Sequence, residues 1–467
     1  MMGIRAGGLG LILVLVTGCA PSGASAGASA DPWEEMERIL ARISPPEFPA
    51  AEFPVTEYGA RGDGSTDCTD AFRKAIEACA AGGGGRVSVP RGVFLTGPVR
   101  LLGNVNLHLD SGAVMKFHTD PARYLPPVFT RWEGVECMNY SPLLYAFEQE
   151  NIAVTGSGTL DGQADTLHWW PWKGSREGGW REGMPTQKEG RARLFRMGEE
   201  GIPVAGRIMG EGAYLRPSFL QPYRCRNILI EGVRIVNSPM WEIHPVLCEN
   251  VTVRNVHIRT HGPNNDGCNP ESSRDVLIRD CFFDTGDDCI AIKSGRNNDG
   301  RRLGIPSENI VIQRCTFRDG HGGVTIGSEV SGGTRNVFAE DCSMESPVLY
   351  SALRIKSNAV RGGTVENVHL RRISVGLVDR AVVDIDLFYE EGKNGNHLPV
   401  IRNISIEGMT VRRCKTALNL VGYEEAPLRD IRLTDCDFRE VTGSWAIRHV
   451  EGLRLVRTTV NGRELIP

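Results

Sequence analysis

Short alternating runs of apolar residues recur along the chain, and each run follows an Asn or an Asp. Apolar side chains fall one, three, six and eight positions after that residue, as in Val251, Val253, Val256 and Ile258 after Asn250. Each half of the pattern alternates with period two, which is typical of a short strand with one buried face. The break between positions three and six indicates a corner. Eight copies begin at Asn227, Asn250, Asp275, Asn309, Asn336, Asn367, Asn403 and Asp430.

Successive copies lie 23 to 36 residues apart. A repeat of that length, built from short strands and corners, is typical of a parallel β-helix. One coil cannot bury its apolar face alone, so we expect residues 51–467 to stack into a single solenoid. A leucine-rich or propeller repeat is the alternative, but the helical part of the first and the blade signatures of the second are missing.

Two segments depart from the repeat. A helical pattern near residues 70–81 ends at four glycines, and we expect this helix to cap the open end of the solenoid. Residues 120–222 interrupt the rhythm and contain many Gly, Arg and Trp residues. This insertion is either a packed elaboration of the solenoid wall or one wall of a substrate cleft, where aromatic faces pack on sugars and Arg pairs with carboxylates.

The first residues predict export and a lipid anchor. Arg5 precedes a short apolar run, and Val16-Thr17-Gly18-Cys19 resembles a bacterial lipobox, so residues 1–18 read as a lipoprotein signal peptide with Cys19 lipidated. A plain secretion signal is the alternative. Residues 19–50 read as a tether followed by a short helix from Asp31 to Ile43. We therefore expect the bacterial cell envelope, at the periplasmic or surface face of the outer membrane.

Charge and cysteines exclude some classes of function. The net charge of -4 over 467 residues gives no support to nucleic-acid binding. Twelve cysteines follow Cys19, and four of them, Cys281, Cys315, Cys342 and Cys436, stand at the sixth position of the repeat, where other copies carry aliphatic residues. We interpret these four as buried free thiols, while Cys68 and Cys79 stay open. No Cys or His cluster suggests zinc. We expect a monomer.

The repeat brings an unusual set of charges to one face. Asp287 lies twelve residues after its anchor Asp275, and His321 lies twelve after Asn309. Equal offsets in adjacent coils place these side chains one above the other, about 4.8 Å apart. Asp266 follows its own anchor by sixteen residues and reaches the same side. Asp residues also fill turns in solenoids, and three carboxylates suit calcium, so both alternatives stand beside an acid-base site.

Two cations join this face from a later coil. In Leu353-Arg354-Ile355-Lys356 the apolar pair points inward, so Arg354 and Lys356 point outward. Carboxylic acids can exchange protons with a glycosidic oxygen, and cations can hold an acidic sugar. Together they suggest hydrolysis of an anionic polysaccharide, and the cations weaken the calcium alternative.

Four motifs in order resemble the polygalacturonase family, family 28 of the glycoside hydrolases. They are Asn264-Asn265-Asp266, Gly286-Asp287-Asp288, Gly320-His321-Gly322 and Arg354-Ile355-Lys356. The family has Thr where this chain has Asn265. The resemblance extends from about Phe53 to the end and implies a right-handed parallel β-helix that cleaves α-1,4-linked galacturonate in pectin without a cofactor or metal.

The resemblance also implies roles within an inverting mechanism. Asp287 would be the general acid, oriented by His321, and Asp266 and Asp288 would hold and deprotonate water on the opposite face, 6.5–9.5 Å from the acid in the usual geometry. Arg354 and Lys356 would bind a substrate carboxylate, and Asn264 would position the site. Crowding of the three carboxylates would raise the pKa of at least one.

The mode of attack is predicted from the surroundings of these motifs. The insertion and the basic residues Lys293, Arg296, Arg301 and Arg302 suggest a cleft closed at one end, and the stretches around Trp241 and Arg296 look like bacterial exo-acting members. Tyr389 is a candidate for packing against a sugar. A calcium-dependent polysaccharide lyase, a rhamnogalacturonan-type hydrolase and a non-catalytic glycan-binding solenoid remain as alternatives.

Overall fold

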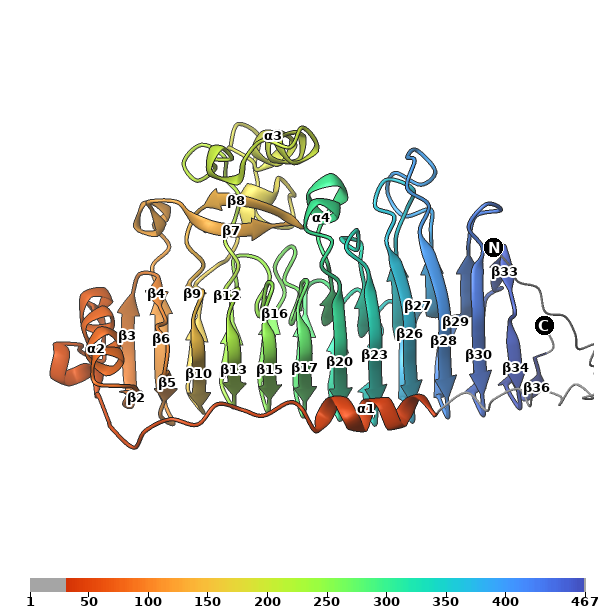
Figure 1. The fold of residues 1–467 in the computed structure, drawn as a ribbon, viewed down its shortest axis with the longest axis horizontal. Helices are drawn as coiled ribbons and strands as arrows, with labels where there is room; N and C mark the ends of the chain where they lie inside the picture. The colour runs from red at the N-terminus through yellow and green to blue at the C-terminus, as the bar shows by residue number, and fades with distance from the viewer. Residues whose placement is uncertain (1–30, 466–467) are drawn as a thin grey trace, which may run out of the picture.

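The repeated pattern folds into coils that stack along one axis (Figure 1). The structure is a computed structural model that describes residues 31–465, so Cys19 and the predicted signal peptide lie outside the described residues. Successive coils pair in parallel, with one antiparallel pairing, β35 with β36, at the C-terminal end, and the coils form a right-handed parallel β-helix, as predicted.

The first strands of the coils form a 13-stranded sheet along the whole solenoid. Its strands are β2 (Gly85–Val89), β5 (Val105–Leu109), β10 (Glu150–Gly156), β13 (Arg226–Glu231), β15 (Glu249–Arg254), β17 (Arg274–Arg279), β20 (Ser307–Gln313), β23 (Thr334–Glu340), β26 (Thr364–Arg371), β28 (Val400–Glu407), β30 (Leu428–Thr434), β33 (Val450–Glu451) and β34 (Arg454–Val456).

The remaining strands of the coils lie mainly in an 18-stranded sheet. Its strands are β1 (Asp63–Asp67), β3 (Gly92–Thr96), β6 (Ala113–Phe117), β11 (Thr159–Asp161), β14 (Arg234–Val236), β16 (His257–Thr260), β18 (Phe282–Thr285), β19 (Ile290–Ile292), β21 (Thr316–Asp319), β22 (Val324–Ile326), β24 (Ser343–Met344), β25 (Leu353–Lys356), β27 (Ser374–Asp386), β29 (Thr410–Val421), β31 (Asp437–Phe438), β32 (Ala446–Arg448), β35 (Thr459–Val460) and β36 (Arg463–Glu464). A three-stranded sheet contains β4 (Val99–Arg100), β9 (Leu144–Phe147) and β12 (Leu220–Tyr223).

The Asn and Asp anchors explain why the coils repeat so regularly. All eight adopt a left-handed backbone, such as φ 58° at Asn309, which short polar side chains tolerate best among residues with a Cβ. Their side chains also join coil to coil: Asn309 Nδ2 donates to Asp275 Oδ1 at 3.0 Å, and Asn336 Nδ2 donates to Asn309 Oδ1 at 3.0 Å. The anchor therefore fixes both the local bend and the register of the stack.

The middle coils contain one strand more than the alternation predicts. After β17 and β18, the chain forms the short strand β19, which pairs with β22, and β22 pairs with β25. A strand of three residues is too short for its period to stand out in the sequence. Its position matters because the candidate site residues lie on or just before these third strands.

The interior confirms the prediction for cysteine. Cys281, Cys315, Cys342 and Cys436 are buried among aliphatic and aromatic side chains of the central core. All cysteines from Cys68 onward, including Cys79, are free thiols, which settles the two that the sequence left open.

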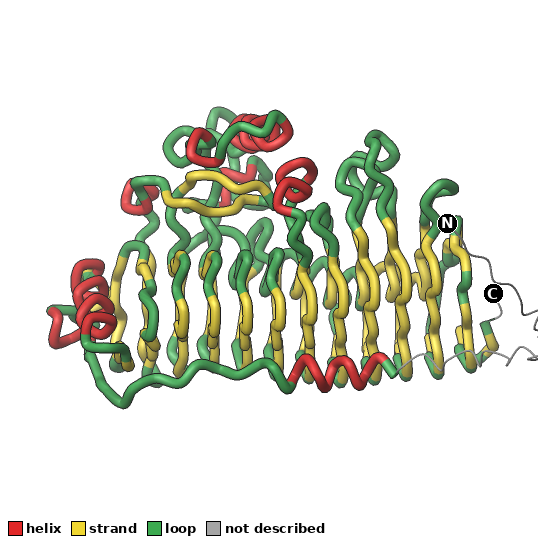
Figure 2. The backbone as a smooth tube through the Cα atoms, in the orientation of Figure 1, coloured by secondary structure: helices red, strands yellow, loops and turns green. Residues whose placement is uncertain are grey.

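Both predicted helices are present. Helix α2 (Thr69–Ala81) covers the N-terminal end of the solenoid and contributes Phe72 and Ile76 to the central core. Helix α1 (Pro32–Leu40) begins after the N-cap Asp31, whose carboxylate accepts the amide hydrogen of Trp33 at 3.0 Å. It lies on the outer face of the 13-stranded sheet, and the following segment runs back along the coils to α2 (Figure 2). No helix among residues 31–465 is both long and apolar enough to span a bilayer.

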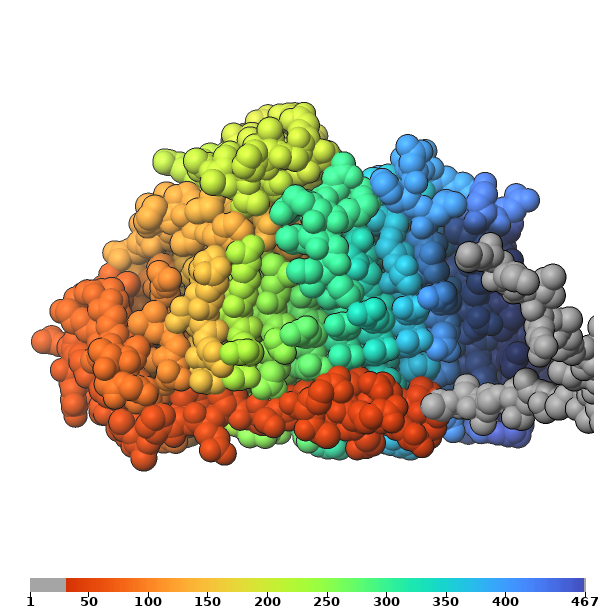
Figure 3. All heavy atoms as spheres, in the orientation of Figure 1, coloured from red at the N-terminus to blue at the C-terminus, as the bar shows by residue number. Residues whose placement is uncertain are grey.

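The insertion rises over one side of the first half of the solenoid (Figure 3). It contains the antiparallel hairpin β7 (Val128–Trp132) and β8 (Val135–Asn139), helix α3 (Lys188–Glu199), and the short 3₁₀ helices η2 (Pro121–Tyr124), η3 (Trp170–Lys173) and η4 (Val204–Gly206). A further 3₁₀ helix, η1 (Val55–Tyr58), precedes β1, and α4 (Asn297–Leu303) follows β19 beside the insertion.

Candidate active site

The loop before Asp266 is held by a buried amide. The side chain of Asn265 accepts hydrogen bonds from Thr260 Oγ1 and Gly262 N at 2.7 and 2.6 Å, and it donates to the backbone oxygens of Ser238 and Met240. Asn265, which replaces the family's Thr, thus points away from the pocket and fixes the loop to the preceding coil. This anchoring holds the next residue, Asp266, at the surface of the site.

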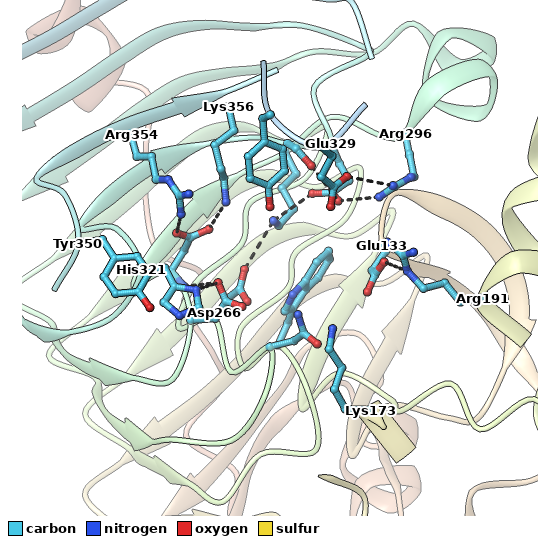
Figure 4. Close-up of a pocket in the computed structure, with 18 residues that line it drawn as sticks. Glu133, Lys173, Arg191, Asp266, Arg296, His321, Glu329, Tyr350, Arg354 and Lys356 are labelled. Carbon is cyan, nitrogen blue, oxygen red and sulfur yellow. Dashed lines mark hydrogen bonds and ion pairs between the residues drawn. The ribbon is translucent and has the colours of Figure 1, made fainter. Parts of the chain in front are cut away.

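Three carboxylates converge at the third side of the coils. Asp266, Asp287 and Asp288 each bring an oxygen within 4.8 Å of the others, and they line one pocket (Figure 4). Their side chains are unequally accessible: Asp287 is 20% exposed, while Asp266 and Asp288 are 3% and 1% exposed. Asp287 is therefore the carboxylate that a bound sugar can reach most directly.

Lysines and arginines offset the charge of the two buried carboxylates. Lys356 Nζ lies 2.7 Å from Asp288 Oδ2, and Arg354 Nη1 lies 3.8 Å from Asp288 Oδ1. Lys293 Nζ lies 3.5 Å from Asp266 Oδ2. The period-two prediction for β25 is confirmed, since Arg354 and Lys356 point into the pocket while Leu353 and Ile355 are buried in the core.

His321 and Asp287 form a hydrogen-bonded pair, as their equal offsets predict. His321 Nδ1 lies 3.0 Å from Asp287 Oδ1, and Tyr350 stacks on the imidazole with ring centroids 4.5 Å apart. Burial alone would lower the pKa of His321, but the hydrogen bond and charge of Asp287 outweigh it and raise that pKa. Burial opposes ionisation of Asp287, yet the contact with His321 holds the pKa of Asp287 below its ordinary value. The pair therefore shares one proton at the pocket surface.

Asp266 has the opposite character. Burial and the nearby charge of Asp287 raise its pKa well above the ordinary value. Asn269 Nδ2 donates to Asp266 Oδ2 at 3.0 Å, but the buried Oδ1 has no partner among the described residues. A proton or a water molecule on Oδ1 would satisfy this atom. The crowding predicted to raise a carboxylate pKa thus acts on Asp266 rather than on Asp287.

The insertion and three later loops complete the pocket. Glu133, Lys173 and Arg191 come from the insertion, and Arg296, Glu329 and Glu390 come from other loops. Arg191 Nε contacts Glu133 Oε2 at 2.7 Å, and Arg296 Nη1 contacts Glu329 Oε1 at 3.2 Å. The cavity encloses about 290 Å³, at the small end of the range for ligand sites.

Comparison with known proteins places this geometry in a family. Residues 205–454 match the model of glycosyl hydrolases family 28. The solved structure of a hyperthermoactive exopolygalacturonase from Thermotoga maritima is 46% identical, with a TM-score of 0.89 over 93% of this chain and 97% of that chain. The chain belongs to glycoside hydrolase family 28.

Curated relatives extend the similarity at lower identity. An exo-poly-alpha-D-galacturonosidase from Dickeya chrysanthemi is 29% identical over 356 residues, which cover 72% of this chain and 57% of that protein. A probable polygalacturonase from Vitis vinifera is 28% identical over 423 residues, or 85% of this chain and 77% of that protein. This chain is thus a glycoside hydrolase of the polygalacturonase type.

Within residues 31–465, the pocket of this family 28 member contains every catalytic and substrate-binding residue expected from the sequence. Asp266, Asp287, Asp288, His321, Asn264, Arg354, Lys356, Lys293, Arg296 and Tyr389 all line it. Asn264 Oδ1 accepts a hydrogen bond from Arg216 Nη2 at 2.8 Å, which fixes its orientation. The roles assigned to these residues stay predictions, because position alone does not test them.

Two expectations about the surroundings need correction. Arg301 and Arg302 do not line the pocket: Arg301 donates to the backbone oxygens of Val360 and Arg361, and Arg302 pairs with Asp299. The tryptophans of the insertion do not line it either, because they pack within the insertion and against the solenoid. The indole in the pocket belongs to Trp241 instead. The insertion does form a wall, but with charged side chains.

Several pocket residues escaped the sequence analysis. Glu329 lies after β22 and Tyr350 lies before β25, in loops next to strands that the alternation did not reveal. Glu329 forms an ion pair with Lys293 at 3.2 Å. Glu133, Lys173 and Arg191 lie in the insertion, where no repeat relates sequence position to space. In a segment without a repeat, the sequence does not indicate where a charged side chain points.

The three carboxylates lie close enough together to hold a divalent cation. Lys293, Lys356 and His321 already contact their oxygens, at 3.5, 2.7 and 3.0 Å. A divalent cation would be repelled by these groups and would have to displace them. The donor set fits an acid-base site better than it fits calcium.

Proposed function

We propose that this protein hydrolyses α-1,4-linked galacturonic acid from the end of pectic chains, with inversion at the anomeric carbon. One observation carries this proposal: a pocket lined by the insertion and by later loops combines three clustered carboxylates with the outward cations Arg354 and Lys356. The carboxylates supply acid-base chemistry, and the cations complement the charge of a uronate.

Asp287 is the general acid in this proposal. It is the most accessible of the three carboxylates and shares a proton with His321. A bound sugar would cover Asp287, and loss of water raises the pKa of a carboxyl. The proton of the pair then moves onto Asp287 and from there to the glycosidic oxygen as the C–O bond breaks.

Asp266 and Asp288 hold the water that attacks the anomeric carbon. Both are too buried to touch a sugar carbon themselves, but each can accept a hydrogen bond from a water molecule in the pocket. Transfer of one water proton to this pair balances the proton that Asp287 delivers. Attack by water from the opposite face gives the β-anomer from an α-linkage.

The spacing of the carboxylates departs from the usual inverting geometry. Oxygens of the three side chains lie within 4.8 Å, whereas acid and base in inverting glycosidases are commonly about 6.5–9.5 Å apart and those of retaining enzymes about 5–5.5 Å. Inversion is inferred here from the burial of Asp266 and Asp288, which disfavours either as a nucleophile. The stereochemical test below therefore decides between two real alternatives.

Exo action is inferred from the side chains that line the pocket and from its small volume. The insertion and the Arg296–Glu329 ion pair form the walls of the pocket. A cavity of about 290 Å³ admits a short end of a chain rather than a long segment. The Thermotoga and Dickeya relatives carry exo-acting names, whereas a relative from Pectobacterium carotovorum at 25% identity is an endo-polygalacturonase. Wall residues therefore matter more to this inference than family membership.

The test uses defined oligogalacturonides and polygalacturonate. We expect monogalacturonate as the first product, slow loss of viscosity relative to reducing ends, and an initial β-anomer in proton NMR spectra. A ladder of mixed oligomers at early times would contradict exo action, and an initial α-anomer would contradict inversion. A lyase would instead give an unsaturated product and lose activity with a chelator.

A further inference from the structure

Lys173 is exceptional among the cations of the pocket. Five others, Arg191, Lys293, Arg296, Arg354 and Lys356, each have a carboxylate oxygen within 4.0 Å. Lys173 also lines the pocket, yet its ammonium makes no hydrogen bond or ion pair with any residue of the described range 31–465. It is the pocket's one cation without a protein counter-charge in that range.

The position of Lys173 is fixed by its neighbours. It is the last residue of η3, which is seated on the loop that carries Asp266. Trp170 Nε1 donates to the backbone oxygen of Ser238 at 2.9 Å, and its indole lies so close to Gly262 that a Cβ there would fall 2.2 Å from the ring. Asn265 binds the same Ser238 oxygen. The base of Lys173 is thus tied to the catalytic loop.

The close-up shows where the ammonium points. Lys173 extends toward the centre of the pocket, and in this view it lies on the opposite side of Asp266 from Arg354 and Lys356 (Figure 4). Burial disfavours the charged form and lowers the pKa of Lys173, while the charges of Glu133 and Asp287 act in the other direction. A ligand carboxylate at this point would offset the cost of holding an ammonium away from water.

We propose that Lys173 binds the carboxylate of the terminal uronate at the closed end of the pocket, on the other side of the scissile bond from Arg354 and Lys356. This inference rests on the proposed function and deepens it. The enzyme would then recognise two consecutive charged uronates, one on each side of the carboxylates that cleave the bond. Its substrate class would be chain ends whose terminal uronate is not methyl-esterified.

The test compares three trigalacturonates: one unesterified, one with a methyl ester at the reducing-terminal sugar and one with the ester at the other terminus. An ester removes the negative charge that Lys173 would bind. We expect the parent enzyme to discriminate about 10- to 100-fold in kcat/KM against the ester at the terminus that enters the pocket, the range for a charge-assisted hydrogen bond. The effect should lie in KM, because the contact binds and does not react.

Variants assign this discrimination to Lys173. Lys173→Met should raise KM for the unesterified trimer about 10- to 100-fold and should cleave ester and acid with similar kcat/KM. Lys173→Arg should keep the preference for the unesterified terminal uronate. Lys188→Met, on an exposed residue of the same insertion that does not line the pocket, is the matched control and should behave as the parent. Thermal unfolding of Lys173→Met should occur at a temperature no lower than that of the parent, because the ammonium makes no hydrogen bond or ion pair within residues 31–465 that the substitution could remove.

The outcomes separate this inference from the proposed function. If the parent cleaves no galacturonate at all, the proposed function fails. The role of Lys173 is wrong, while the hydrolase activity stands, if the parent cleaves the unesterified trimer and both esterified trimers with equal kcat/KM. The same conclusion follows if Lys173→Met still discriminates between ester and acid.

Discussion

At the scale of single residues, the site separates three carboxylates by their surroundings. Asp287 faces the pocket beside His321, Asp288 lies between Lys356 and Arg354, and Asp266 is buried with an unpartnered oxygen. Asp287 and Asp266 thereby acquire different affinities for a proton, since the pKa of Asp287 is lowered and that of Asp266 is raised, as acid-base catalysis at one site requires.

Asp287→Asn tests the assignment of the general acid. The amide keeps the size of the side chain but supplies no proton, so turnover should fall by about 10²- to 10⁴-fold. Asp284→Asn is a suitable control, because Asp284 lies on the same coil and contacts His261 at 3.0 Å outside the pocket. Steady-state kinetics on trigalacturonate measure both. Near-normal turnover by a folded Asp287→Asn protein would rule out the assignment.

Glu242 is a buried acid outside the proposed chemistry. Its side chain is fully buried, neither oxygen has a partner among the described residues, and burial followed by the charge of Asp266 raises its pKa well above 4.5. In the unfolded chain this carboxyl ionises near pH 4.5, whereas in the folded protein it keeps its proton to higher pH. Folding therefore loses stability as the pH rises above 4.5.

Glu242→Gln should remove this dependence, because the amide stays neutral at every pH. Relative to the parent, the variant should gain about 1.4 kcal/mol in free energy of unfolding per pH unit above pH 4.5, until the folded-state pKa is passed. Denaturant unfolding at pH 4, 6 and 8 measures the trend, with the exposed Glu57→Gln as a control. A difference that stays constant over this range would show that Glu242 is ionised in the folded protein.

At the scale of elements, the anchors of the coils carry the fold. All eight have a left-handed backbone, and side chains such as those of Asn309 and Asn336 form a hydrogen bond with the anchor of the preceding coil. The strand that follows then starts at a fixed point, and this is why equal offsets brought Asp287 and His321 together in adjacent coils.

Asn309 allows the two contributions to be separated. Asn309→Gly keeps access to φ 58° but loses two side-chain hydrogen bonds, whereas Asn309→Ala also forces a Cβ into the left-handed region. We expect Ala to be less stable than Gly by about 1–2 kcal/mol, the reverse of their usual order. Chemical denaturation of both variants measures the difference. Equal stabilities would mean that the backbone conformation contributes little.

At the scale of the whole molecule, we propose that the solenoid is held at the bacterial cell envelope by lipid on Cys19, which lies outside the described residues. Helix α1 lies on the outer face of the 13-stranded sheet. There Trp33, Met36 and Ile39 pack on Leu277, Val311 and Phe338. Helix α1 therefore lies on the side of the solenoid away from the wall that the insertion forms (Figure 1).

Cys19→Ser tests the anchor. Lipid should attach to the parent at this thiol, and one acylated cysteine with two or more chains gives stable membrane association. The variant should lose its lipid and fractionate without membranes, while its activity on trigalacturonate stays at the parent value because the substitution changes none of the residues that line the pocket. Mass spectrometry and fractionation of intact cells measure the outcome. Soluble, unlipidated parent protein from intact cells would contradict the proposal.

The sequence by itself determined the solenoid, its capping helix and the set of acids, histidine and cations that share one face. This was possible because each coil repeats the same local rules: an anchor that tolerates a left-handed backbone, then strands of period two whose parallel pairing carries the register to the next coil. The four residues from Leu353 to Lys356 were enough to predict that Arg354 and Lys356 point outward, since alternate residues of a strand face opposite sides.

Only the tertiary structure decided how the pocket is closed. Lys173, Glu133 and Arg191 reach it because the insertion is seated on the catalytic loop by particular distant contacts, such as Trp170 on Gly262 and Arg216 on Asn264. Trp170 is held by one of these contacts, and Trp132, Trp169 and Trp172 pack in the hydrophobic clusters, so none of these four is free to bind a sugar in the pocket. A repeat relates position in sequence to position in space, whereas a single insertion is positioned by long-range packing, which no local pattern encodes.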